Sequence, residues 1–348
     1  MSESVENPLR FLFYVTLSYS YAVLRPIEKV IKSKGYKVAW FIPQGAEAEK
    51  FLTDSDQRLM TVKQVKQFDS HAVLAPGNYI PDFFPGIKVQ VFHGFDSGKK
   101  NKFQVRGFFD LYCTQGPNIT EAFTKINDGT YDVVETGWSK LDPLFHPHPQ
   151  TQNFTSDKPV VFYAPTFSPK LTSTYELLPE IKALIAQKDW HWIIKLHPKA
   201  TKEESEMFAA LAGEKVKFIE TGDIIPLLQA ADVILSDTSS VLAEFALQQK
   251  PVVALNNRRP EDWMINFTEP TELSVHLSNA LNKEENLMAR VSQLCAAIHP
   301  RKDGKASDRV VNAIEEAVAK GTGHLKAKPL NLVRRLKMRK KLKYYRWR

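Results

Sequence analysis

Short apolar runs alternate with helix-like stretches along most of the chain, and this alternation constrains the fold more than any other feature. Runs that predict strands lie at residues 11–17, 38–42, 72–74, 89–92, 111–114, 133–135, 160–164, 192–196, 217–220, 233–236 and 252–255. Intervening segments such as 21–34 and 240–248 have the apolar spacing of amphipathic helices. The alternation predicts an α/β fold with parallel, doubly wound sheets.

A stretch rich in Pro and His, residues 142–158, interrupts this alternation, which then starts again. A chain of 348 residues is long enough for about two domains. We therefore expect two Rossmann-like domains facing a cleft, where ligands bind open α/β sheets. The expected bounds are 1–145 for the first domain, 146–158 for a linker, 159–300 for the second domain, 301–325 for a C-terminal helix and 326–348 for a tail.

The positive charge of the chain is concentrated in that tail. Residues 326–348 hold eleven Lys or Arg and no acidic residue, which leaves 36 basic against 39 acidic residues in the rest of the chain. Apolar and aromatic residues between the bases predict an amphipathic helix that binds an anionic membrane surface. A solvated or RNA-binding tail is the alternative. The nearly neutral body argues against extended nucleic-acid contact, so we expect no nucleic-acid partner.

The location of the protein is predicted from its N-terminal residues and cysteines. The uncharged stretch 11–24 is shorter than a membrane-spanning helix requires, and the N-terminus lacks the pattern of a signal peptide. Two cysteines, Cys113 and Cys295, cannot form a disulfide framework or a zinc site by themselves. We expect a cytoplasmic protein that associates peripherally with the inner face of the membrane through its tail.

The most informative local motif is the run of small hydroxylated residues after the apolar strand 233–236. Asp237, Thr238, Ser239 and Ser240 lead into a helix that carries Glu244 in its first turn. Free backbone amides at a helix start, together with serine hydroxyls, form a site for a phosphate. An ordinary helix cap is the alternative, and Glu244 could face a ribose hydroxyl or solvent.

Three further segments place polar groups after predicted strands. Lys195 and His197 follow one strand, and a cation at the carboxyl end of a strand favours phosphate binding, although such a histidine can also be structural. His93 and Gly94 follow another strand; a glycine lets a ligand approach the backbone, and a neutral imidazole is a suitable general base. Thr166 follows a third strand through a proline turn.

Other familiar sites are absent from the sequence. The chain contains no Gly-x-Gly-x-x-Gly, no Gly-x-x-x-x-Gly-Lys-Ser/Thr and no Gly-x-Ser-x-Gly motif. His146 and His148 have no acidic residue or cysteine nearby in the sequence, so they do not predict a metal site.

Taken in order, six segments resemble the CDP-glycerol glycerophosphotransferase family of teichoic-acid-type polymer synthesis, which has the two-domain GT-B fold. They are His93-Gly94, Gly137-Trp-Ser-Lys-Leu-Asp142, Tyr163-Ala-Pro-Thr166, Lys195-Leu-His-Pro198, Ser236-Asp-Thr-Ser-Ser240 and Asp303-Gly-Lys-Ala-Ser307. The chain departs from the family pattern at Phe95, where many members have Thr, at Thr238, where Tyr is usual, and at Glu244, where Asp is usual.

The resemblance implies a reaction and a set of site residues. The first domain would take the acceptor and the second the nucleotide donor. CDP-glycerol would be the donor, its glycerol phosphate would pass to a hydroxyl of a lipid-linked or polymeric acceptor, and CMP would leave without a metal or other cofactor. The implied catalytic residues are His93, as general base, and His197. The implied substrate-binding residues are Gly94, Thr166, Lys195, Asp237, Thr238, Ser239, Ser240 and Glu244.

Two alternatives keep part of this interpretation. The same phosphate site would serve a GT-B glycosyltransferase that uses a nucleotide sugar, or a transferase that uses CDP-ribitol. A non-catalytic membrane-binding or nucleic-acid-binding protein is the alternative from another class.

Overall fold

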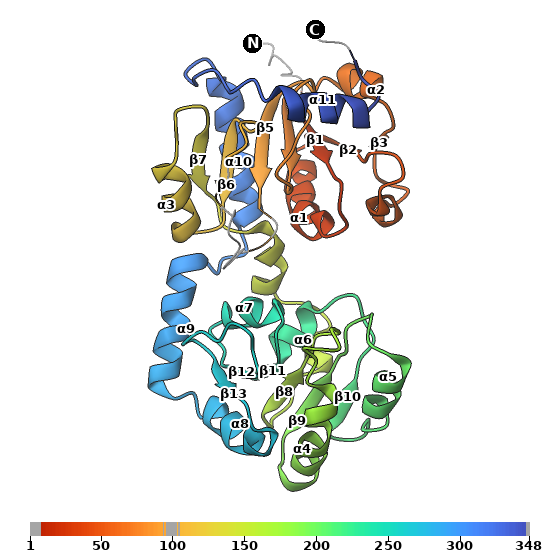
Figure 1. Cartoon of the computed structure of the whole chain (residues 1–348), viewed down its shortest axis with the longest axis vertical. Coiled ribbons are helices and arrows are strands. Elements are labelled where there is room, and N and C mark those ends of the chain that lie inside the picture. The colour runs from red at the N-terminus through yellow and green to blue at the C-terminus, as the bar shows by residue number, and fades with distance from the viewer. Residues whose placement is uncertain (1–7, 93, 95–102, 104, 346–348) are drawn as a thin grey trace, which may run out of the picture. The chain divides into compact units, whose positions relative to one another are not determined.

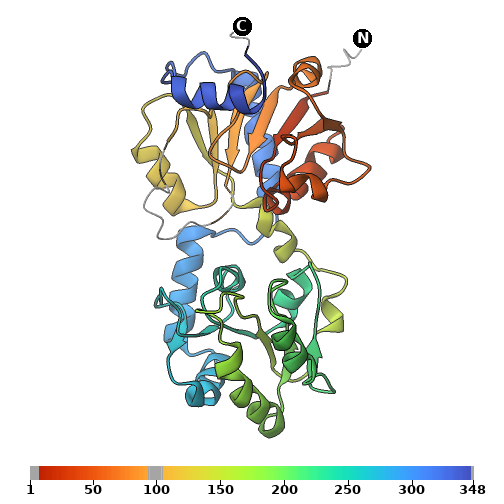
Figure 2. The ribbon, with the colours of Figure 1, turned by 45° about the vertical axis from the view of Figure 1, so that its right-hand side comes forward.

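The chain divides into two compact units, each containing its own sheet. The computed structural model describes residues 8–92, 94, 103 and 105–345. Unit 1 comprises Met1–Asp142 and Asp303–Arg348, and unit 2 comprises Pro143–Lys302. The C-terminal segment, blue in Figures 1 and 2, therefore returns to the unit in which the chain starts. These bounds differ from the predicted ones, because the expected linker at 146–158 belongs to unit 2 and the C-terminal helix and tail belong to unit 1.

Within the described residues, unit 1 is built on a seven-stranded sheet with the order β3-β2-β1-β4-β5-β6-β7. All of its strand pairs are parallel. The strands are β1 (Arg10–Tyr14), β2 (Lys37–Phe41), β3 (Arg58–Leu59), β4 (Ala72–Ala75), β5 (Ile87–Val91), β6 (Leu111–Thr114) and β7 (Asp132–Glu135). The α-helices are α1 (Ser20–Ser33), α2 (Val62–Phe68), α3 (Pro117–Lys125), α10 (Ala306–Lys320) and α11 (Leu332–Lys341).

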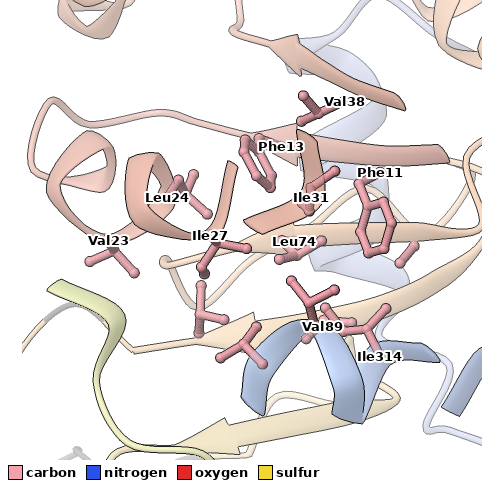
Figure 3. Packing of buried hydrophobic residues seen from close by; sticks show 14 of the residues in the cluster. Phe11, Phe13, Val23, Leu24, Ile27, Ile31, Val38, Leu74, Val89 and Ile314 are labelled. Atoms are coloured by element: carbon pink, nitrogen blue, oxygen red, sulfur yellow. The ribbon is translucent and has the colours of Figure 1, made fainter. Parts of the chain in front are cut away.

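The alternating side chains of β1 contribute to the two faces of this sheet. Phe11 and Phe13 lie in one buried cluster, which also contains Ile27 of α1 and Ile314 of α10. Figure 3 shows these residues packed between the strands and the two helices. Successive strand residues point to opposite faces, so Leu12 belongs to a second cluster on the other face. Burial on both faces explains the nearly continuous apolar runs of β1, β2 and β4.

Helices α2 and α3 and the C-terminal tail contribute to that second, strongly aromatic cluster. Its core includes Tyr14, Phe41 and Tyr112, and Met338, Leu342 and Tyr344 pack against it. Part of the apolar pattern of the tail therefore covers the sheet of unit 1. The tail is helical at α11, as predicted, and its last residues, 346–348, lie outside the described part of the chain.

Unit 2 contains, among the described residues, a six-stranded parallel sheet with the order β10-β9-β8-β11-β12-β13. The strands are β8 (Val160–Tyr163), β9 (His191–Ile194), β10 (Val216–Phe218), β11 (Val233–Ser236), β12 (Val252–Leu255) and β13 (Ile265–Phe267). The α-helices are α4 (Thr174–Gln187), α5 (Lys202–Ala209), α6 (Ile225–Ala230), α7 (Val241–Ala246), α8 (Leu273–Leu281) and α9 (Glu285–Ile298). Short 3-10 helices η1 (Glu47–Phe51), η2 (Ser139–Phe145), η3 (Thr151–Asn153) and η4 (Pro270–Glu272) complete the chain.

The segment predicted to be a linker is held against α6 by Gln229. The amide nitrogen of Gln229 donates to the carbonyls of Leu144 (3.0 Å) and His146 (2.6 Å), and its amide oxygen accepts from the Thr151 hydroxyl (2.6 Å). The Pro- and His-rich sequence of this segment does not indicate that a glutamine far away in the chain will hold the segment in place. The prediction of two doubly wound parallel α/β domains is confirmed, and every predicted strand overlaps a strand of the structure.

Candidate functional site

The topology of unit 2 selects one place on its sheet for a ligand. Strands β8 and β11 are neighbours, but the chain continues from β8 to β9 on one side and from β11 to β12 on the other. Ligands of open parallel sheets bind at such a switch point, outside the carboxyl ends of the strands. The two loops that leave this point contain Thr166 and the hydroxylated run 237–240.

Asp237 connects these two loops. Its carboxylate accepts hydrogen bonds from the backbone N–H of Thr166 (2.9 and 3.2 Å) and from both the backbone N–H and the hydroxyl of Ser173 (3.0 Å each). The residue is only 1% exposed, and burial raises the pKa of its carboxyl although these bonds oppose the shift. Asp237 therefore shapes the loop after β8, and its predicted contact with substrate stays a prediction.

The serines that follow are only partly used as helix caps. The hydroxyl of Ser239 accepts from the backbone N–H of Val241 at 3.4 Å, whereas Ser240 is exposed and makes no side-chain cap hydrogen bond. The ordinary cap that was the alternative interpretation therefore accounts for Ser239 but leaves the Ser240 hydroxyl open to solvent. Glu244 is 8% exposed within α7, and its proposed contact with a ribose stays a prediction.

Lys195 and His197 line a cavity of about 380 Å³ beside the ends of β9 and β10. Ser205, Glu220 and Thr221 also contribute to its wall, but Ser239 and Ser240 do not. The structure therefore brings the predicted cation and imidazole together and places the two serines outside this cavity. Burial lowers the pKa of Lys195.

His197 has a defined tautomer in this position. The backbone N–H of Lys199 donates to its Nδ1 at 3.1 Å, so the neutral ring carries its proton on Nε2. Burial, together with the charges of Lys195 and Lys199, lowers the pKa of His197. The ring is thus neutral at pH 7 and presents an N–H donor.

Phe167, which the sequence analysis did not select, packs against His197. The ring centroids lie 4.3 Å apart, and Lys199 Nζ lies 5.2 Å from the centroid of the same phenyl ring. This contact joins the loop after β8 to the loop after β9. The adjacent Thr166 is fixed by Asp237, so the aromatic contact and the buried carboxylate together define the path of one loop.

Two arginines after β12 were also missed. Asn257 donates from Nδ2 to the carbonyl of Asp237 (2.7 Å), and the backbone N–H of Arg258 donates to the Thr238 hydroxyl (3.1 Å). These bonds place Arg258 and Arg259 next to the hydroxylated run. The sequence already indicated these two arginines, because they follow an apolar strand just as Lys195 does.

The predicted site of unit 1 is described only in part. His93 lies outside the described residues. At Gly94 an added Cβ would meet no described atom within 4 Å, so packing does not require glycine there. The indole N–H of Trp138 donates to the carbonyl of Phe92 (2.8 Å) and fixes the end of that segment. Gln115, after the neighbouring strand β6, is buried, and neither polar atom of its amide group is hydrogen-bonded to another described residue.

The described residues contain neither a metal-binding cluster nor a membrane-spanning helix. The part of the chain that the structure describes contains no cluster of three or more His, Cys, Asp or Glu side chains that could hold a metal ion. No helix among these residues has both the length and the apolar character needed to cross a bilayer.

Sequence comparisons identify relatives of this chain. Residues 87–259 match the family described as CDP-glycerol:poly(glycerophosphate) glycerophosphotransferase. Two teichoic acid glycerol-phosphate primases are similar. The one from Bacillus subtilis (strain 168) is 26% identical over 149 residues, which is 41% of this chain and 38% of the primase. The one from Bacillus spizizenii is 27% identical over 156 residues, 44% of this chain and 36% of the primase. The matched segment thus spans well under half of either relative.

Solved structures show the same fold at low sequence identity. The wall teichoic acid polymerase TagF has a TM-score of 0.64 and 15% identity, with 90% of this chain and 89% of that chain covered. A TagF variant soaked with CDPG gives the same score and identity. A UDP-N-acetylglucosamine 2-epimerase has a TM-score of 0.60 and 16% identity, with 93% and 99% covered. The predicted GT-B class of fold, with two Rossmann-like domains, is confirmed.

Proposed function

The chain belongs to the CDP-glycerol glycerophosphotransferase family, and from this premise we propose that it transfers glycerol phosphate from CDP-glycerol to a hydroxyl of a lipid-linked or polymeric acceptor. The product would be part of a teichoic-acid-type polymer, and CMP would be released. The observation that carries this proposal is the hydrogen-bonded pair of loops at the switch point of unit 2, where Asp237 fixes Thr166.

The donor would bind at the carboxyl edge of the unit 2 sheet. Its diphosphate would accept hydrogen bonds from Ser239, Ser240 and the N–H of His197, and Lys195 would neutralise charge. We add Arg258 to this set, because its backbone N–H is held by Thr238 at the same edge. Fixed cations of this kind support phosphoryl transfer by positioning and electrostatic stabilisation, and we propose that no metal or other cofactor is required.

The transfer would proceed by attack of the acceptor hydroxyl on the phosphorus that bears glycerol. A new O–P bond forms, the P–O bond to CMP breaks, and CMP leaves with the bridging oxygen. His93 would accept the proton of the attacking hydroxyl. A general base of this kind contributes about 10²–10⁴-fold to the rate.

Release of CMP from CDP-glycerol tests this proposal. Purified protein would be incubated with membranes or a lipid-linked acceptor analogue, with and without EDTA. We expect CMP release in both conditions, and loss of release in His93→Ala. His191→Ala is the matched control, because His191 begins β9 and so lies away from the carboxyl ends of the strands, where the donor would bind. Circular dichroism would verify that each variant is folded.

Other donors decide between the remaining alternatives. CDP-ribitol and UDP-sugars would be offered under the same conditions. Absence of CMP release from CDP-glycerol, together with turnover of a UDP-sugar, would favour the glycosyltransferase and refute the proposed donor. No release from any donor would favour the non-catalytic alternative.

We further propose that residues 326–348 hold the protein peripherally on the cytoplasmic face of an anionic membrane, where a lipid-linked acceptor would be present. The support is the distribution of residues on α11. Its face away from the sheet carries exposed Leu332, Val333 and Leu336 together with Lys337 and Lys340. Apolar and basic residues on one helix face are the combination by which an interfacial helix binds a bilayer.

A further inference from the structure

The tail is a fixed part of unit 1. One face of α11 packs inward through Met338 and Arg339, and Arg339 is only 5% exposed. The guanidinium of Arg339 donates to Asp82 at 3.1 Å and lies 4.6 Å from the ring centroid of Phe83. The hydroxyl of Tyr14 contacts the sulfur of Met338 at 3.5 Å. These contacts hold the helix against the strands and beside α2 (Figure 1).

The chain turns sharply after α11 and forms one wall of a large, open cavity. Lys343 adopts a left-handed backbone conformation with φ 51°. Tyr344 is thereby returned to the body of unit 1, where its ring stacks on Phe83 at 4.5 Å. Between residues 341–344 and the segments 41–45 and 60–67 lies a cavity of about 880 Å³. This volume is in the range of small-molecule sites, which run to about 1,000 Å³.

The charged residues known to line this cavity have one sign. Lys63 and Lys66 of α2 and Lys341 and Lys343 of the tail all line it, and no acidic residue among those that the structure describes does so. None of these four lysines forms an ion pair with another residue in the described ranges; Lys66 lies 5.5 Å from the ring centroid of Tyr344. Four like charges around one volume repel one another, so an anion inside it would be bound favourably.

The cavity also has apolar walls. Phe41, Met60, Val62 and Leu342 line it beside the lysines. An inorganic anion would leave these walls unused. A ligand that joins a phosphate group to an apolar part matches both kinds of lining.

We propose that this cavity binds the phosphodiester headgroup of an anionic phospholipid. The lipid is favoured over a soluble phosphate because the same helix exposes Leu332, Val333 and Leu336, which are 52%, 66% and 50% exposed. Residues four apart lie in one row of a helix, so Leu332, Leu336 and Lys340 form one such row. This inference rests on the membrane association proposed above and is independent of the transferase chemistry.

Vesicle binding by the full chain tests the proposal. Sedimentation with vesicles of phosphatidylglycerol in phosphatidylcholine would be measured for wild type, for Lys63→Gln with Lys66→Gln, and for Lys341→Gln with Lys343→Gln. The control pair is Lys29→Gln with Lys37→Gln, two exposed lysines of unit 1 that do not line the cavity. Every pair removes the same charge. We expect each cavity pair to bind about tenfold more weakly and the control pair to lose less than about threefold.

The possible outcomes separate the alternatives. Equal losses in the cavity and control pairs would mean general electrostatic attraction and would overturn the proposal. Calorimetric binding of soluble glycerol phosphate that is weakened in the cavity pairs, while their vesicle binding equals that of the control pair, would identify a free phosphate ester as the ligand and would also overturn the proposal. These lysines are exposed to solvent, so we expect the variants to keep their fold. An unchanged thermal unfolding transition of each variant would verify this.

A further comparison distinguishes this inference from the proposed function. If wild type fails to bind any anionic vesicle, both the membrane association and the lipid cavity are refuted. CMP release with a soluble acceptor analogue would be unaffected by that result. If CMP is never released, but the variants of the cavity lysines bind vesicles more weakly and the control variant does not, the cavity proposal stands and the transferase proposal is refuted.

Discussion

The carboxylate of Asp142 accepts a hydrogen bond from the backbone N–H of Ser307 at 2.7 Å, although the two residues lie 165 positions apart in the chain. Its second oxygen accepts from the N–H of Ala306 at 2.8 Å. Asp142 ends the N-terminal segment of unit 1, and it thus caps helix α10 in the C-terminal segment of the same unit. Arg309 reinforces this junction by donating to the carbonyl of Thr136 at 2.7 Å.

We expect Asp142→Ala to destabilise unit 1 by about 1–3 kcal/mol, because two N–H groups at a buried helix start lose their acceptor. Urea denaturation followed by far-UV circular dichroism would measure the loss. Asp54→Ala is the matched control, since Asp54 is exposed and accepts no side-chain hydrogen bond among the described residues. Equal midpoints for the two variants would contradict this account of the junction.

Asp237→Asn is expected to weaken both the fold of unit 2 and donor binding. The backbone N–H groups of Thr166 and Ser173 now donate to different oxygens of the carboxylate. Asparagine keeps one acceptor oxygen, so its NH2 group would face one of these N–H donors and that hydrogen bond would be lost. The expected destabilisation is about 1–3 kcal/mol. Calorimetric titration with CDP-glycerol would measure the affinity, with exposed Asp262→Asn as control. A variant that loses stability but binds CDP-glycerol normally would show that this loop is not part of the donor site.

Arg258→Gln is expected to lower the affinity for CDP-glycerol by about tenfold or more, because a hydrogen bond to a charged phosphate is lost. Stability should be unchanged, since the contact with Thr238 is made by the backbone of Arg258. The control is Arg301→Gln, an exposed arginine of the same unit. Equal affinities in the two variants would exclude Arg258 from the donor site.

The affinity for CDP-glycerol is expected to rise as the pH is lowered from neutral, through protonation of His197. Burial and the neighbouring charges of Lys195 and Lys199 lower the pKa of His197, so the imidazole is neutral at pH 7 and gains its charge only in acid. A positive imidazolium attracts the diphosphate, which keeps its own charge in this range. Titrations between pH 7.5 and 5.5 should show this increase in wild type and in His191→Gln. A His197→Gln variant with the same increase would refute the assignment.

Much of the fold was predictable because it depends on local pattern. The apolar run at 233–236 coincides with β11, and that at 111–114 coincides with β6. The short strands β3 and β13 and the helices α8 and α9 were not predicted, and β3 has only two residues. Its pairing with β2, through Trp40 and Phe41, defines it more than its own sequence does.

The candidate site was predicted as a set of loops but not as a set of contacts. Ser240 and Lys195 were selected because they follow apolar strands, and the same rule applied to β12 would have selected Arg258. Asp237 was selected as a ligand for substrate, whereas the structure shows a buried carboxylate that holds the backbone of another loop. Such a bond spans 71 residues, and nothing near either partner in the sequence indicates it.

The sequence by itself determined the α/β class, the position of most strands and the hydroxylated and basic segments at their ends, because apolar periodicity and residue type are local properties. The tertiary structure decided that the C-terminal segment completes unit 1, that Asp142 caps α10, and that α11 uses one face for packing while Lys341 and Lys343 line a cavity with two lysines of α2. These features depend on which distant surfaces bury one another. Burial between distant segments is a property of the whole folded chain and cannot be deduced from any single stretch of residues.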